Sequence, residues 1–547
     1  MITRKKHHAL LAFSLAALLA PADSAAARKF YDDDPLEREP APRDASKAAR
    51  RKISDYFDFF QQTFASPAEK HKPGKPIPAQ GVNTLGEPMD GAWYSHRHYY
   101  QPMSIEELKR GPGTGPAPSM QGKWRVVKAK SEGVTPGLEF IDSGNRRYVL
   151  KFDPLDYPEI ATAPDVLVSK IFHAVGYWVP DNFIVHFTYD QLELSNDVKL
   201  IDAKGKERLM THRDLTELLM RVPKDKEGRY RGGASLFLKG KPIGPYKYFT
   251  TRADDPNDTV NHEHRRDLRG LSVFCAWVAH DDSRSINSLD MIVDAGGAAP
   301  HIRHHLIDFG STLGSASYGP NSPRSGFEYV FQMGPALKQF FTLGLAVPDW
   351  AKAKYPNDPA VGRFESKRFN AAGWLAEYPN PAFTNRLPDD AFWAAKQVMA
   401  FTDEQVRAIV DTGQYSRPES ANWITAALIE RRNKIGRDFF AQVLPLDKFV
   451  IRDGALAFED LEVKHHLRAG RTVNAAWSVF DNETEKKSGL AGASTLNIPA
   501  DGVATGGYLA CDLTSPDAKD AKKTVTVYLR KLASGFKIVG IDRTWPR

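Results

Sequence analysis

The chain has 547 residues, of which 42% are hydrophobic and 26% charged. At roughly 150 residues per domain this length predicts three or four structural units. The composition excludes a wholly disordered, collagen-like or coiled-coil protein. The net charge of +7 comes from 74 basic and 67 acidic residues spread along the chain. Because the excess is not concentrated in one segment, no nucleic-acid-binding face is expected.

Residues 1–27 have the pattern of a secretory signal peptide. Basic residues at 4–6 precede an apolar run at 9–20, and small residues at 25–27 follow it. The run is too short for a transmembrane helix, and no later segment is long and apolar enough to be one. We therefore expect cleavage near Ala27 and a periplasmic or secreted protein without a membrane span in its mature chain.

An N-terminal extension is expected over 28–117. Within it, residues 46–64 carry apolar side chains at helical spacing, which predicts an amphipathic helix packed on the main body. These side chains are Ile53, Tyr56, Phe57, Phe60 and Phe64. Residues 111–122 are rich in glycine and proline and predict a linker.

Short strands follow the linker and predict a first lobe over 118–190. Pro164 suits the first turn of a helix that runs to Val175, and Gly176 then ends it. Another strand ends at Phe187. Three further strand patterns precede the helix, at 124–130, 138–141 and 147–152.

The rest of the chain is predicted to form a helical lobe over 191–445 and a small β domain over 446–547. In the helical lobe, Thr402 offers an N-cap with Gln405 three residues later. The other expected elements there are a buried helix at 265–279, strands at 289–294 and 302–307, and mainly helices over 327–445. The β domain is predicted from short β runs at 461–467, 471–480, 494–498, 506–513, 523–532 and 535–542.

The two cysteines, Cys275 and Cys511, do not indicate thiol chemistry. Cys275 lies inside an apolar helical segment, and without a CxxC pair a thiolate zinc site is excluded. Two buried free thiols are the favoured interpretation, although export would permit a disulfide.

The polar residues most suggestive of chemistry lie at two places. Asp282 and Asn287 belong to one loop, and Asp308 follows an apolar strand as the first residue of Asp-Phe-Gly. Phosphoryl transfer requires this set, because one aspartate orients or deprotonates the attacking hydroxyl while an asparagine and a second aspartate hold Mg²⁺. Upstream, Lys151 ends a strand from which a lysine can reach nucleotide phosphates. The loop 131–137 occupies the position of a phosphate-covering turn.

In this order of motifs the sequence resembles the protein-kinase-like superfamily, over roughly 118–445. The sequence pattern is similar to that of the atypical branch of this superfamily, which contains HipA-type, phosphoinositide-kinase-like and secreted CotH-like kinases. The resemblance implies an α+β, bilobal fold that binds ATP with Mg²⁺ or Mn²⁺. It also implies Asp282 as catalytic residue and Asn287 and Asp308 as metal ligands. The implied cofactor-binding residues are Lys151, Gly133, Gly137 and Asp165.

The sequence departs from the family pattern at several points. His280-Asp281 stands where a His-Arg-Asp triplet would be, and the phosphate loop has only Gly133 and Gly137. No Ala-Pro-Glu follows Asp308. The pattern does not identify the acidic residue that should pair with Lys151: Asp165 lies in the first turn of the expected helix, and Glu159 lies just before it.

The sequence favours an exported phosphotransferase. Its acceptor, whether a protein, a sugar or a small molecule, is not identified by the sequence. The same scaffold could also support nucleotidyl transfer. A catalytically inactive kinase-like binding module is the first rival, because ATP is scarce outside the cytoplasm. A metal-dependent hydrolase is the second, and it would use the histidines at 262, 264, 304 and 305.

Overall fold

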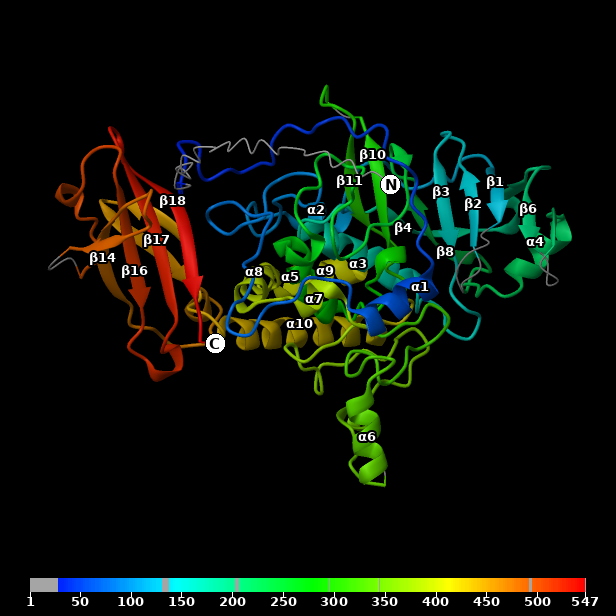
Figure 1. The fold of residues 1–547 in the computed structure, drawn as a ribbon. Coiled ribbons are helices and arrows are strands. Elements are labelled where there is room, and N and C mark those ends of the chain that lie inside the picture. Colours follow the sequence, from blue (N-terminus) through cyan, green and yellow to red (C-terminus); the bar gives the residue numbers. More distant parts are fainter. Residues whose placement is uncertain are drawn as a thin grey trace, which may run out of the picture.

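The computed structural model of the chain describes three bodies that lie side by side (Figure 1). A strand-rich N-lobe and a C-terminal β domain flank a central helical lobe, so the predicted α+β, bilobal fold with an appended β domain is confirmed. In the part of the chain that the structure describes, no helix is both long and apolar enough to cross a bilayer. The described residues are 28–129, 137–201, 206–294, 296–343, 345–490 and 494–546.

The N-lobe is built on one twisted sheet with strand order β4-β8-β3-β2-β1-β5. Its core includes the stacked rings of Trp124 and Phe140, 4.4 Å apart. A hairpin of β6 (Lys199–Ile201) and β7 (Glu207–Leu209) and the helix α4 (His212–Leu219) adjoin it. The sheet strands are β1 (Trp124–Ala129), β2 (Gly137–Ile141), β3 (Arg147–Lys151), β4 (Asn182–Phe187), β5 (Leu192–Leu194) and β8 (Tyr230–Leu236).

The N-lobe continues past residue 190, where its predicted boundary lay. Strand β8 lies between β3 and β4 and pairs with both, which places residues up to Leu236 in this sheet. Met210, Leu215 and Leu219 also join its apolar core. The segment expected to open the helical lobe therefore completes the N-lobe.

Helix α3 (Thr162–Ala174) is the one long helix among the described residues of the N-lobe, and nearly all of its side chains are buried. The carboxylate of Asp153 accepts hydrogen bonds from the backbone N–H groups of Ala161 and Thr162, at 2.8 and 2.9 Å, which satisfies donors at the helix start. Gly176 follows the helix at φ +110° with Tyr94 packed against its Cα, so only glycine fits there.

The central lobe packs helices around the fully buried α5, which contacts α8 and α10. Thr402 caps α9 with the predicted capping box. The expectation of helices throughout 327–445 is only partly met, because residues 353–380 are mainly loop. The elements are α5 (Arg266–Val278), β9 (Lys241–Pro242), β10 (Ser288–Val293), β11 (His301–Leu306), α6 (Met333–Phe341), α7 (Pro381–Thr384), α8 (Pro388–Val398), α9 (Asp403–Asp411) and α10 (Pro418–Phe440).

The C-terminal β domain combines a hairpin with a sheet of order β15-β14-β16-β17-β18. The run at 461–467, predicted as a strand, is the helical turn α11 (Leu461–Lys464), capped by the Asp460 carboxylate. The hairpin strands are β12 (Leu446–Arg452) and β13 (Ala455–Asp460). The sheet strands are β14 (Asn474–Phe480), β15 (Lys487–Gly489), β16 (Tyr508–Thr514), β17 (Thr524–Leu532) and β18 (Gly535–Thr544).

The N-terminal segment runs across the whole molecule before the N-lobe begins (Figure 1). Phe30 is buried in the β domain between Phe480, Tyr508 and Tyr528. Further along lie α1 (Asp55–Phe60), which continues into a π-helical turn η1 (Gln61–Ala65), and α2 (Ile105–Arg110).

Helix α1 meets the body through buried polar side chains and through half-buried Phe59, whose ring packs against Tyr378 at 5.5 Å. Asp58 and Gln62 are buried, whereas Tyr56, Phe57 and Phe60 are more than half exposed. The helix is shorter than the 46–64 segment whose spacing predicted it, and its aromatic side faces outward. Asp58 accounts for this orientation, because it accepts hydrogen bonds from the helical lobe.

Candidate functional site

Lys151, Asp165 and Asp308 meet where the two lobes join. Lys151 ends β3, and its Nζ lies 3.3 Å from Asp165 Oδ2 and 2.8 Å from Asp308 Oδ1. Asp165 comes from the first turn of α3 and is buried, and its Oδ1 accepts a 2.8 Å hydrogen bond from the backbone N–H of Phe309. One aspartate thus ties the strand lysine to the Asp308-Phe309 segment.

The open question of the lysine's partner is settled by this geometry. Glu159, the other candidate, accepts hydrogen bonds from the backbone N–H of Ser416 at 3.0 Å. Burial disfavours the charged form of Lys151, but the charges of Asp165 and Asp308 outweigh it and raise the pKa of this ammonium. Lys151 is therefore a cation at neutral pH.

Asp282 and Asn287 lie on the loop that follows α5. The helix ends at Val278, and Ala279 turns the chain through the left-handed region at φ +51°. The Nδ2 of Asn287 donates a 2.7 Å hydrogen bond to the Asp282 carbonyl, which folds the loop back on itself. The side chain of neighbouring Asp281 points elsewhere and accepts from Ser325 Oγ at 2.5 Å.

The β10–β11 hairpin brings Asp308 to this loop although it lies far along the sequence. Ser288 pairs with Leu306 at the open end of the ladder, and the Ile307 N–H donates to the Asn287 carbonyl at 3.0 Å. Asn287 and Asp308 therefore leave the same end of one antiparallel pair. The residues between Asn287 and Asp308 form this hairpin.

Asp308 and Phe309 have opposite surroundings. Asp308 adopts φ +63°, and its side chain is 43% exposed. Phe309 is fully buried, and its ring stacks on Phe172 of α3 at 5.2 Å. The left-handed turn thus directs the aspartate toward solvent while the phenylalanine packs between the lobes. A non-glycine residue in this conformation costs about 1–2 kcal/mol, and such strain gathers at functional sites.

Asp282, Asn287 and Asp308 line one open cavity of about 690 Å³. Its wall also includes Arg284 and Glu377, which the sequence reasoning did not single out. Arg284 contacts Asp282 and lies 3.2 Å from Glu377 and 3.1 Å from Asp55 of α1. The signal available in the sequence was a basic residue two positions after Asp282.

The carboxylate of Asp282 is poised for proton transfer near neutral pH. Burial raises its pKa to about 7, against the opposing charge of Arg284. A carboxylate in this range exchanges a proton more readily at neutral pH than an ordinary aspartate does.

The donor atoms in the cavity fit a hard divalent cation. Asn287 uses its Nδ2 as a hydrogen-bond donor, so its Oδ1 remains the acceptor atom, and Asp308 presents a carboxylate. Amide and carboxylate oxygens are the ligands that Mg²⁺ and Mn²⁺ prefer. Asn287 and Asp308 would hold such an ion, with nucleotide phosphates supplying further oxygens.

Of the two glycines predicted to bind phosphate, Gly137 lies in the described part of the chain and Gly133 does not. Gly137 begins β2 and lies opposite Lys151 in the β2–β3 ladder. Gly133 lies outside the described residues, as do the other residues of 130–136 and the predicted signal peptide.

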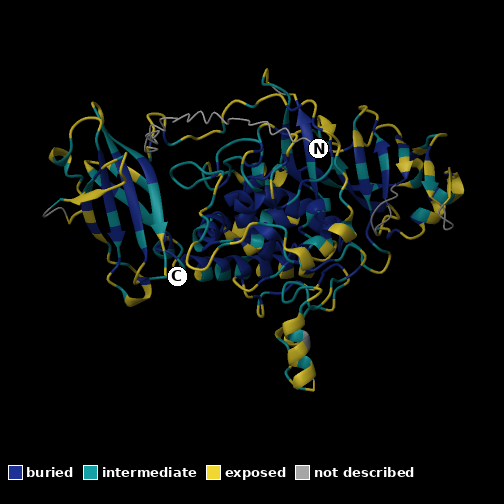
Figure 2. Cartoon of the chain, in the orientation of Figure 1, coloured by how far each residue is buried: buried dark blue, intermediate teal, exposed yellow. Residues whose placement is uncertain are grey.

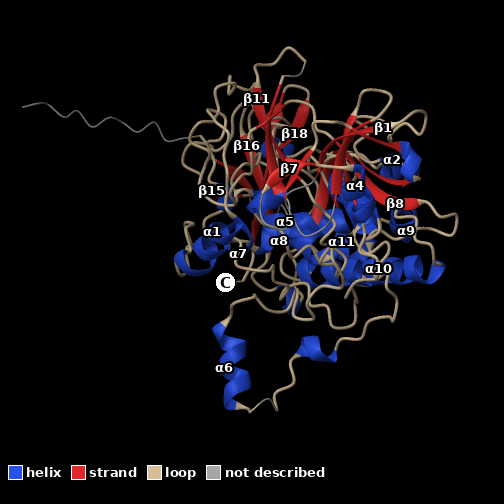
Figure 3. Cartoon of the chain, turned by 90° about the vertical axis from the view of Figure 1, so that its right-hand side faces the viewer, coloured by secondary structure: helices blue, strands red, loops and turns tan. Residues whose placement is uncertain are grey.

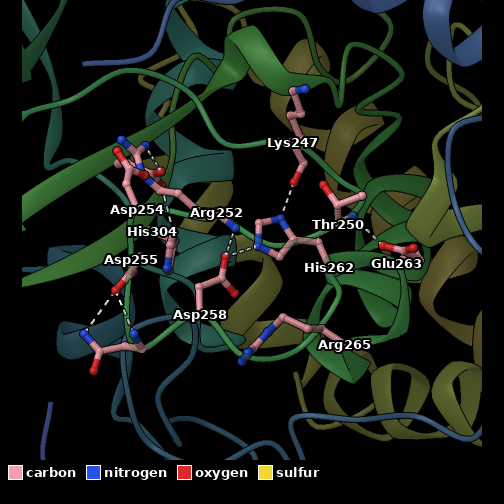
Figure 4. A network of polar contacts seen from close by, with 12 residues as sticks. Lys247, Thr250, Arg252, Asp254, Asp255, Asp258, His262, Glu263, Arg265 and His304 are labelled. Atoms are coloured by element: carbon pink, nitrogen blue, oxygen red, sulfur yellow. Dashed lines mark hydrogen bonds and ion pairs between the residues drawn. The ribbon is translucent and has the colours of Figure 1, made fainter. Parts of the chain in front are cut away.

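Two of the four histidines that suggested a hydrolase, His262 and His304, belong to a buried structural network (Figure 4), whereas His264 contacts Glu69 and Arg269 and His305 contacts the Arg303 carbonyl. His262 Nε2 lies 2.7 Å from Asp258 Oδ2, and His304 Nδ1 lies 2.7 Å from Asp290 Oδ1. Arg252 joins the two halves by bonding to both carboxylates. Across the described ranges, no three His, Cys, Asp or Glu side chains gather as a metal-binding group. Cys275 and Cys511 are buried and free.

Comparison with known proteins gives structural matches alone. No model of a known protein family matches the chain, and no curated protein matches its sequence. Among solved structures, the crystal structure of the Golgi casein kinase matches with a TM-score of 0.29 and 10% identity, over 73% of this chain and 96% of that one. The structure of the Golgi casein kinase with Mn and ADP bound matches with a TM-score of 0.28 and 10% identity, over 73% and 94%.

Proposed function

We propose that this protein is an exported phosphotransferase that uses ATP and a divalent cation. The observation that carries the proposal is the convergence of Lys151, Asp165 and Asp308 beside a cavity that also holds Asp282 and Asn287. These residues come from four segments, and three contacts join them to one another: Lys151 to Asp165, Lys151 to Asp308, and Asn287 to the Asp282 carbonyl. The predicted signal peptide is the basis for export.

Each residue has a distinct task in the proposed reaction. Lys151, kept charged and fixed by Asp165, binds the phosphates of the nucleotide. Asn287 and Asp308 hold the cation, which would neutralise charge on the transferring group. Asp282 orients the acceptor hydroxyl and takes its proton. Arg284 lies beside Asp282 and supplies positive charge at the same end of the cavity.

The first test is nucleotide-dependent thermal stabilisation of the mature chain. A ligand present at about 100 times its Kd stabilises the folded state by roughly 2.7 kcal/mol. We expect ATP with Mg²⁺ or Mn²⁺ to raise the Tm of the wild type and of Asp294→Asn, an exposed aspartate on the same hairpin. Asp308→Asn should lose the metal-dependent part of this shift.

Two outcomes would contradict the proposal. If no nucleotide shifts the Tm of well-folded protein, the cavity is not a nucleotide site. If nucleotide binds but neither ADP release nor transfer occurs with protein, sugar and small-molecule acceptors, the chain is a kinase-like binding module.

A further inference from the structure

A projecting segment, described over residues 329–343 and 345–348, stands apart from the rest of the surface and is called the tongue. Helix α6 forms its outward arm, and the tongue extends away from the body in both views (Figures 1 and 3). Its exposed side chains are large and apolar: Leu343 and Leu345 near the tip are 88% and 85% exposed. Figure 2 shows the same concentration of exposed residues along α6.

The apolar surface continues from the tongue onto α1. Phe331, at the base of the tongue, packs against Phe64 with ring centroids 5.1 Å apart. Phe57 and Phe60 extend the exposed aromatic surface from there. An exposed apolar surface that spans two segments marks an interaction site rather than ordinary surface variation.

The charges around the tongue favour a lipid surface. Between Tyr329 and Pro348 the sequence has no acidic residue, and its one charged side chain is Lys338. The exposed charged residues that follow are Asp349, Lys352 and Lys354, and Lys352 pairs with Asp349 at 3.4 Å. Half-buried Tyr329 and Trp350 lie at the base. An apolar tip, amphipathic aromatic residues at its base and neighbouring lysines are the pattern of a protein segment in the interface of an anionic bilayer.

A second copy of the chain fits the tongue less well. Helix α6 has 9 residues and so is about 14 Å long, and two such helices would bury one face each. That area falls short of the roughly 1,200 Å² of a stable protein interface. Leu343 and Leu345, the most exposed large apolar side chains of the tongue, lie beyond the helix end and outside such a helix pair.

We propose that the tongue docks the protein on an anionic lipid bilayer. The side chains of Phe340, Phe341 and Leu343 enter the boundary between headgroups and acyl chains, and the lysines contact the headgroups. Val330 also lines the cavity that contains Asp282, so docking sets the mouth of that cavity beside the membrane. The inference does not depend on the phosphotransferase activity.

Vesicle sedimentation tests the docking. The chain beginning at Arg28 is used, because this removes the apolar run at 9–20 as a competing source of binding. It should pellet with equimolar phosphatidylglycerol–phosphatidylcholine vesicles. The variant Phe340→Ser/Phe341→Ser/Leu343→Ser should bind at least about tenfold more weakly. The matched control Ile201→Ser/Leu209→Ser changes exposed apolar residues of the β6–β7 hairpin and should bind like the wild type.

The lysines and the depth of insertion are tested separately. Lys338→Glu/Lys352→Glu/Lys354→Glu should lose roughly fivefold in binding per lysine at low salt. Because both native cysteines are buried, Leu343→Cys can be labelled with an environment-sensitive dye. Its emission should shift to shorter wavelength on vesicles, whereas the same dye on Leu209→Cys should not respond.

Three results would overturn the proposal. The first is equal binding by the wild type and the triple serine variant when both have the same Tm. The second is a dye at position 343 that does not respond to vesicles. The third is a lipid-independent dimer, seen by analytical ultracentrifugation, that the serine variant abolishes; this would assign the tongue to a second copy of the chain.

Discussion

The molecule contains two clusters of buried polar residues, one within the helical lobe and one where the two lobes join, and they differ in what their side chains can reach. In the histidine network, Asp258 bonds to His262 and to the Arg252 backbone N–H, and Asp290 bonds to the Arg252 guanidinium, so the polar groups bond one another within the fold. In the site between the lobes, referred to as the cleft, Lys151 and Asp165 also pair with each other. Asp308 and Asp282, however, border the open cavity. The difference shows that access to a cavity, rather than the number of charged residues, distinguishes a candidate reaction site from a structural network.

The largest expected difference between the two clusters follows from removing the proposed acid–base group, the Asp282 carboxylate. Asp282→Asn should lower the rate of phosphotransfer by about a hundred- to ten-thousandfold, the usual contribution of a positioned acid–base residue. Nucleotide-dependent stabilisation should persist, because Asp282 binds neither phosphate nor metal in the proposed site. Asp258→Asn in the histidine network is the matched control, and folded protein carrying it should keep the wild-type rate. Retained activity in Asp282→Asn would remove this residue from the mechanism.

The second prediction concerns a substitution in the buried histidine network, where a change should affect stability and not the reaction. Asp290→Ala leaves Arg252 buried without one of its carboxylates, and should lower the free energy of unfolding by about 3–5 kcal/mol. Urea unfolding measures this loss, while the rate per folded molecule should stay the same. The double variant Arg252→Met/Asp290→Leu should recover much of the stability, because it removes both charges. If the double variant is no more stable than the single one, the network has a role beyond charge pairing.

A smaller effect tests the tie between the lobes. Asp165→Asn should weaken ATP binding by about tenfold, the value of one charge-assisted hydrogen bond. Glu159→Gln is the matched control, since that side chain bonds to Ser416 and not to Lys151. Isothermal titration calorimetry on both variants decides between the two acidic residues. A weaker affinity in Glu159→Gln alone would contradict the pairing.

The smallest expected effect lies at the rim of the cleft. Asp55 of α1 is 40% exposed and lies 3.1 Å from Arg284, and an ion pair of this exposure is worth at most about 1 kcal/mol. Asp55→Asn should therefore slow phosphotransfer by no more than about fivefold in a steady-state assay. A loss as large as that of Asp282→Asn would make α1 an essential part of the site.

The elements set by local chemistry were predictable from the sequence, and those set by distant contacts were not. Thr402 and Gln405 predict the start of α9, because all the residues of a capping box lie within one stretch of four. Strand β8 was missed because its partners, β3 and β4, lie far upstream. The aromatic spacing of α1 predicted a helix but could not show that Asp58, bonded to Tyr378 at 3.2 Å, would turn the aromatic side outward.

The candidate site divides in the same way. The order of the motifs and their positions after apolar runs predict four site residues, which are Lys151, Asp282, Asn287 and Asp308. The choice between Asp165 and Glu159 required the three-dimensional arrangement, because both lie near the start of α3. Arg284 was overlooked for a related reason: its importance lies in contacts with α1 and Glu377, which no local pattern reveals.

The burial of Phe30 in the β domain constrains the order in which the protein can be completed. Phe30 is synthesised near the beginning of the chain, and its partners Tyr508 and Tyr528 near the end. That part of the core therefore closes only after almost the whole polypeptide has been made. If the signal peptide is removed near Ala27, the new N-terminus lies a few residues before this anchor. We expect removal of residues 28–30 to destabilise the C-terminal β domain without changing the site between the lobes.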